Sequence, residues 1–129
     1  MAEKLTDDEL RPVILRWIEV SQQLDDIGRQ LGHIREKYAE LQYPDEIERL
    51  SELEPVDRRK RELAAHEHDL QGRSCRLGNE QAKLDDLIRA TLPVNVWYRV
   101  DGHRLRWVSE PDATPRLVYE EVRELEMAA

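Results

Sequence analysis

The chain has 129 residues, of which 37% are charged and only 5% aromatic, and its formal net charge is −8. This composition is unsuited to a large globular core and typical of long solvated helices, and the acidic balance disfavours non-specific nucleic-acid binding. The single cysteine, Cys75, excludes an internal disulfide and a cysteine-based zinc cluster.

The hydropathy of the sequence bears on secretion and membrane association. The sequence has neither the apolar core of a signal peptide nor an apolar run long enough to cross a bilayer. We therefore expect a soluble, cytoplasmic protein without membrane contacts.

Residues 10–41 predict a coiled-coil-like helix. Apolar positions recur at spacings of three and four and fill two complete heptad rows, a specific signal for knobs-into-holes packing. The a row is Leu10, Trp17, Leu24, Leu31 and Tyr38, and the d row is Val13, Val20, Ile27, Ile34 and Leu41. We expect a short turn capped by Thr6 and Glu9, then the main helix from about Pro12 to Tyr43–Pro44.

Residues 52–89 predict a second long helix, capped by Ser51 with Glu54. It has one apolar row, whereas the companion row reads His66, Arg73 and Glu80; the apolar row is Val56, Leu63, Leu70, Leu77 and Leu84. An antiparallel register then pairs Ile34 with Leu63, Ile27 with Leu70 and Val13 with Leu84, as a helical hairpin requires.

This register uses only the d row of the first helix. Part of the a row, namely Trp17, Leu24, Leu31 and Tyr38, would stay half exposed, which is more apolar surface than a single chain usually leaves uncovered. We expect these four residues to form a homodimer interface. The alternatives are that the C-terminal segment folds back over them or that another protein covers them. Gly28 and Gly32, one turn apart, are either tolerated or mark close approach of another backbone.

Residues 94–108 predict a β-hairpin with a two-residue turn at Asp101–Gly102. The turn fixes the register, with Val100 opposite His103 and Asn95 opposite Val108, and places the apolar side chains on one face. The other face carries Trp97, Arg99, Arg104 and Arg106. These residues are candidates for an anion or single-strand platform. The interpretation we favour is a cation–π pair of Trp97 with Arg106, with the arginines meeting nearby carboxylates.

The segment after the hairpin predicts a short C-terminal helix with Thr114 as N-cap and Pro115 at the first position. The alternative is a third strand over Leu117–Val122.

Catalytic and metal signals are weak. His66, His68, Asp69 and Cys75 do not share one helical face at ligand spacing, and no phosphate loop or nucleophile–base grouping appears. We expect no enzyme, metal or cofactor. The basic run Arg58, Arg59, Lys60 and Arg61 is a candidate for partner binding, although a solvated helix face is the simpler interpretation.

The expected fold is mainly α: a long antiparallel helical hairpin over residues 1–92, then a two-stranded β-hairpin and short helix over 93–129, packed on it in one structural domain. The expected function is that of a non-enzymatic, oligomeric binding or adaptor protein that contacts itself and another protein. One alternative is a small acidic inhibitor that occupies a nucleic-acid-binding groove of another protein. The other is a nucleic-acid binder that uses the arginines and Trp97 of the β-hairpin.

Overall fold

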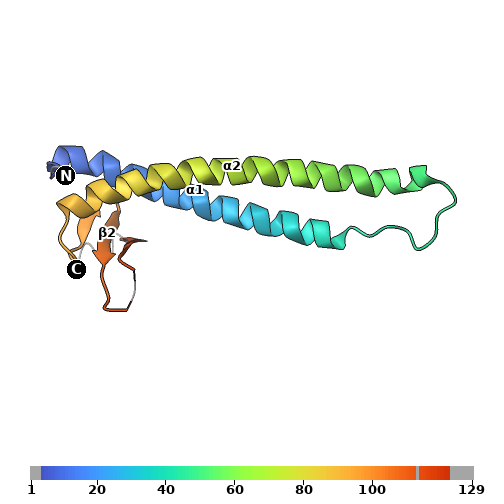
Figure 1. Ribbon diagram of the computed structural model, residues 1–129. Helices are drawn as coiled ribbons and strands as arrows, with labels where there is room; N and C mark the ends of the chain where they lie inside the picture. Colours follow the sequence, from blue (N-terminus) through green and yellow to red (C-terminus); the bar gives the residue numbers. More distant parts are fainter. Residues whose placement is uncertain (1–3, 113, 123–129) are drawn as a thin grey trace. The chain divides into compact units, whose positions relative to one another are not determined.

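The computed structural model describes residues 4–112 and 114–122 and is mainly helical, as expected (Figure 1). Its elements are α1 (Asp7–Glu40), the 3-10 helix η1 (Leu50–Leu53), α2 (Glu54–Thr91), β1 (Tyr98–Val100), β2 (His103–Val108) and β3 (Arg116–Glu121). The chain divides into two compact units, which we call the sheet unit (Met1–Ser21 with Asn79–Ala129) and the hairpin unit (Gln22–Gly78).

The hairpin unit is built from the end of α1 and the beginning of α2. Its core contains Ile27, Ile34, Leu63 and Leu70, all at most 4% exposed. The residues expected to pair across the two helices therefore share one core. At 25 cal/mol per Å², burial of such side chains stabilises the hairpin by about 2 kcal/mol each.

The start of α1 differs from the prediction. The capping box is present, because the Thr6 amide donates to the Glu9 carboxylate at 3.1 Å and the Glu9 amide donates to the Thr6 hydroxyl at 3.3 Å. The helix nevertheless begins at Asp7 and contains Pro12, so the expectation of a start near Pro12 was wrong. Burial of Leu10 and Ile14 on either side of Pro12 offsets the missing hydrogen bond.

The start of α2 also differs. The expected cap at Ser51 is not used, because Ser51 lies inside η1. Instead the Glu52 carboxylate accepts the amides of Glu48 at 2.7 Å and Arg49 at 3.0 Å, and α2 follows from Glu54. These bonds to the charged form lower the pKa of Glu52.

The β-hairpin forms around the expected turn. Asp101 and Gly102 have φ angles of 41° and 80°, as a type I′ turn requires, and Val100 lies opposite His103. The predicted pairing of Asn95 with Val108 is wrong. Asn95 has a φ of 64° and its amide donates to the Trp107 carbonyl at 2.9 Å, so the regular ladder begins only at Tyr98.

The predicted C-terminal helix is corrected to a strand. Residues 116–121 form β3, which pairs antiparallel with β2 and makes a three-stranded sheet in the order β1-β2-β3. Along β3, Leu117 and Tyr119 pack against the core, and Glu120 bonds to Arg104 on the other face. This alternation of period two fits a strand on the free edge of β2. Residues 123–129, where the expected helix would end, lie outside the described residues.

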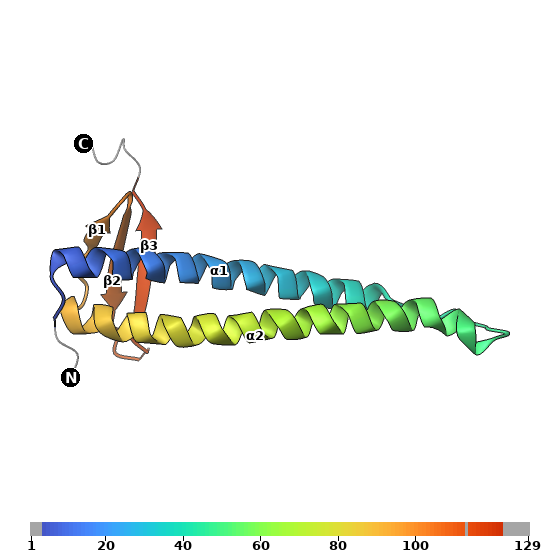
Figure 2. The same ribbon diagram turned by 90° about the horizontal axis from the view of Figure 1, so that it is seen from above.

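The core of the sheet unit joins the sheet to both helices (Figure 2). Leu10, Ile14 and Ile18 of α1 pack with Ile88 of α2 and with Leu105 of β2. On the same side of the sheet, the Trp107 indole N–H donates to the Leu92 carbonyl at 2.7 Å. The two faces of the sheet therefore differ: one packs on the helices, and the other carries the arginines.

Within the described residues, neither helix has an apolar window of membrane-spanning length.

Candidate functional site

The four residues expected at a dimer interface do not share one environment. Trp17 is only 6% exposed and lies in the sheet-unit core, where its ring meets Tyr119 edge-on with centroids 5.6 Å apart. The sheet therefore covers this part of the a row, as the fold-back alternative proposed, and Trp17 is not exposed for a second chain. In the hairpin unit Leu24 and Leu31 are half-buried and Tyr38 is 46% exposed. We call these three residues the apolar stripe.

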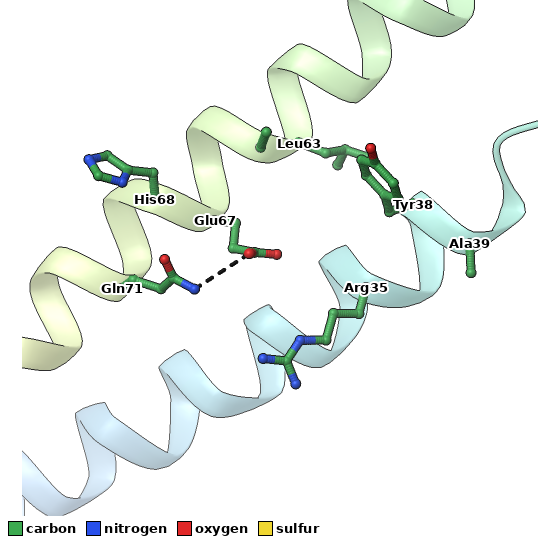
Figure 3. Close-up of a pocket in the computed structure, with 8 residues that line it drawn as sticks. Arg35, Tyr38, Ala39, Leu63, Glu67, His68 and Gln71 are labelled. Carbon is green, nitrogen blue, oxygen red and sulfur yellow. Dashed lines mark hydrogen bonds between the residues drawn. The ribbon is translucent and has the colours of Figure 1, made fainter.

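A groove of about 550 Å³ lies beside one end of the apolar stripe (Figure 3). Its floor and rim come from both helices of the hairpin unit: Arg35, Tyr38, Ala39, Leu63, Ala64, Glu67, His68 and Gln71. On α2 the groove lining thus contains Ala64 and Glu67. His66, which belongs to the companion row expected from the sequence, is exposed and is not among the lining residues.

The other side chain expected in that row also lies elsewhere. In the sheet unit the Glu80 carboxylate accepts from the Arg16 guanidinium, with Nη2 and Oε1 2.8 Å apart. This ion pair lowers the pKa of Glu80 and raises that of Arg16.

A cation lies near two aromatic rings, one of which is Tyr38. The Lys60 ammonium lies 4.3 Å from the centroid of Tyr43 and 5.6 Å from that of Tyr38. The Tyr43 hydroxyl donates to the Asp57 carboxylate, which holds the ring in place. Lys60 thus stabilises the exposed face of Tyr38 within the chain.

The rest of the basic run makes ion pairs along α2. Arg58 and Arg61 both meet Glu54, the latter at 2.8 Å, and Arg59 meets Glu62 at 3.3 Å. Together with the placement of Lys60, these contacts favour the interpretation of residues 58–61 as a solvated, internally paired helix face.

The second candidate surface is the side of the sheet that faces away from the sheet-unit core, which we call the arginine face. Its members within the strands are Arg99, Arg104, Arg106, Val108, Arg116, Val118 and Glu120. Trp97, which directly precedes β1, contacts two of these arginines. The guanidinium carbons of Arg104 and Arg106 lie 4.2 and 4.5 Å from the Trp97 ring centroid. Arg104 also forms an ion pair with Glu120. The predicted cation–π pair and the predicted carboxylate partner are both present.

Sequence reasoning missed part of the arginine face. Arg116, Val118 and Glu120 join it only because β3 is a strand, and the helix prediction separated them from Arg104 and Arg106. The available signal was the alternation of apolar and polar residues in "RLVYEE", which fits period two as well as a short helix.

Asp85 of α2, in the sheet unit, has a half-buried carboxyl group. Burial raises the pKa of Asp85, against the lowering effect of the Arg89 guanidinium 3.1 Å away.

Among residues 4–112 and 114–122, no three side chains of the types that ligate metals are grouped closely enough to hold an ion. A comparison with protein-family models, curated proteins and solved structures finds no match to this chain.

Proposed function

We propose that the protein is a non-enzymatic binding or adaptor protein that forms a homodimer through the apolar stripe and acts by protein–protein contacts. The observation that carries this proposal is the apolar stripe itself, with Tyr38 at the groove between α1 and α2. A row of large apolar side chains that are partly open to solvent, beside a groove, is typical of contact surfaces.

The surface around the groove is suited to a second copy of itself. A two-fold interface brings one patch against the same patch, so the patch must be self-complementary. Here the exposed Tyr38 lines a groove whose other lining residues include the small Ala39 and Ala64, the cation Arg35 and the anion Glu67. Figure 3 shows Arg35 on α1 and Glu67 on α2. In a two-fold dimer, Tyr38 of each copy can enter the groove of the other, and Arg35 of each copy can meet Glu67 of the other.

The apolar stripe also supplies a driving force. Covering the exposed part of Tyr38 contributes about 1 kcal/mol, and covering the smaller exposed part of Leu24 or Leu31 contributes less. Two copies contribute the three residues twice, before the cost of association is subtracted. Such a dimer is stable only if most of the stripe is covered at once.

The test compares two substitutions of matched charge on α1. Leu24→Glu places a carboxylate in the apolar stripe, whereas Gln22→Glu places one at an exposed position of the neighbouring turn. Size-exclusion chromatography with light scattering should show that Leu24→Glu halves the particle mass and Gln22→Glu leaves it unchanged, with equal helicity by circular dichroism. Equal masses for both variants and the unmodified protein would refute the proposed interface.

A second candidate is nucleic-acid binding through the arginine face, which the four arginines favour. An electrophoretic shift of a single-stranded oligonucleotide that is lost in Arg104→Glu would support it. The third class, an acidic inhibitor of a nucleic-acid-binding protein, draws on the net charge of −8. It predicts salt-sensitive binding to a basic enzyme without affinity for nucleic acid.

A further inference from the structure

The arginine face has a charge opposite to that of the chain as a whole. Four arginines and one glutamate lie on it, whereas the protein carries a net charge of −8. Two of the arginines, Arg99 and Arg116, are exposed at opposite edges of the sheet. A positive patch on an acidic protein attracts anionic partners.

Trp97 organises the central arginines of this face. With guanidinium carbons 4.2 and 4.5 Å from the ring centroid, both Arg104 and Arg106 lie in contact with the indole. A guanidinium held against an aromatic ring has already lost part of its rotamer freedom, and its N–H donors lie in the guanidinium plane and not toward the ring face. Both arginines are therefore preorganised to receive an oxyanion.

Arg104 shows which ligand suits this arrangement. Its Nε and Nη2 atoms both meet the carboxylate of Glu120 on the adjacent strand. Arg106 is stacked in the same way, but the residue across from it on β3 is Val118. Its Nε is buried and makes no hydrogen bond within the described residues. Arg104 thus has a carboxylate opposite it on β3, whereas Arg106 has a valine there.

We propose that the arginine face binds an acidic peptide segment of a partner protein, whose carboxylates meet Arg99, Arg106 and Arg116. Apolar side chains of the same segment contact Val108 and Val118, which lie between the arginines. This inference rests on the binding function proposed above and names the chemistry of the partner. It does not depend on the dimer, because the arginine face and the apolar stripe belong to different units.

A peptide fits this face better than a nucleic acid. Single-strand binding relies on aromatic rings that are free to stack on bases. The Trp97 ring already contacts two guanidinium groups, and these contacts compete with stacking of a base on the ring. The acidic remainder of the chain also repels a phosphate backbone, whereas a short acidic segment can be confined to the patch.

The experiment measures fluorescence anisotropy of a labelled peptide composed of glutamate, leucine and valine, with the full-length protein as titrant. A matched peptide with glutamine in place of glutamate and a single-stranded oligothymidine are the other probes. We expect the glutamate peptide to bind, its affinity to fall with added salt, and the glutamine peptide to bind at least tenfold more weakly, because charge-assisted hydrogen bonds are about twice as strong as neutral ones.

Variants locate the binding. Arg106→Gln should weaken peptide binding about tenfold, and the exposed Arg99→Gln and Arg116→Gln, which leave the core untouched, about two- to fivefold each. Arg73→Gln, the same change at an exposed position of α2, should have no effect. Circular dichroism verifies that each variant is folded.

Three results would overturn the inference. One is equal affinity for the glutamate and glutamine peptides, and another is tighter binding of the oligothymidine than of the peptide. The third is that the peptide binds only after residues 123–129 are deleted, which would make the chain's own C-terminus the occupant. A failure of peptide binding with an intact dimer mass would refute this inference and leave the dimer proposal standing.

Discussion

Trp17 connects three elements of the sheet unit. It belongs to α1, lies in one core with Ile88 of α2, and meets the edge of Tyr119 of β3. A single aromatic residue of this size buries more apolar surface than any other side chain type. The packing of β3 against the helices therefore depends on this position.

Trp17→Ala should lower the free energy of unfolding by about 3–5 kcal/mol, because it leaves a cavity in the sheet-unit core. Tyr43→Ala is the matched control: the side chain is 43% exposed and lies outside the apolar stripe, and the loss should be below about 1.5 kcal/mol. Urea denaturation followed by circular dichroism measures both. Equal losses would show that Trp17 is not in the core.

The Arg16–Glu80 ion pair predicts a pH dependence. The pKa of Glu80 in the folded protein lies below its ordinary value of 4.5, so its ionised form is favoured by folding. The stabilisation is complete above that value and is lost as the pH falls through the lower, folded pKa. Glu80→Gln should therefore be less stable than the unmodified protein near neutral pH, and the difference should shrink on acidification. Thermal unfolding across that range tests this, and a difference that grows at low pH would contradict it.

At the scale of elements, the turn at Asp101–Gly102 fixes the register of the sheet. Since Gly102 has a φ of 80°, Gly102→Ala forces an L-residue into the left-handed region and should destabilise the protein by about 1 kcal/mol. Gly72→Ala, within α2, should instead stabilise it by about 0.5–1 kcal/mol, since the added methyl group meets only the Arg76 guanidinium at 3.6 Å. Chemical denaturation measures both changes, and a stabilising Gly102→Ala would refute the turn assignment.

Elements with strong local signals were predictable from sequence. The heptad rows, the Asp101–Gly102 turn and the Thr6–Glu9 cap each depend on residues a few positions apart, and the helical hairpin and β-hairpin follow from them. The nature of residues 116–121 was not predictable, because a short segment adopts the conformation that its neighbours complete. Here the open edge of β2 selects a strand over a helix.

The candidate surfaces were predicted to different extents. The cation–π contact of Trp97 with Arg106 followed from the hairpin register alone. The burial of Trp17 did not, because it depends on tertiary packing of a distant strand. For the same reason, Arg116 was invisible as a member of the arginine face.

At the scale of the whole molecule, the two units suggest a division of labour. In the proposed account, the hairpin unit joins two copies through the apolar stripe, and the sheet unit offers the arginine face to an acidic segment of a partner. The surfaces lie on separate cores, so substitutions in one should leave the other folded. Leu24→Glu should accordingly abolish the dimer while each chain retains its affinity for the glutamate peptide.

The most direct test of the account is sedimentation equilibrium of the unmodified protein over a range of concentrations. The chain has a mass of 15.3 kDa, and the account predicts that the measured mass reaches twice this value and falls on dilution. A mass of one chain at every concentration would contradict it, since the exposed parts of Leu24, Leu31 and Tyr38 would then have no second copy to cover them.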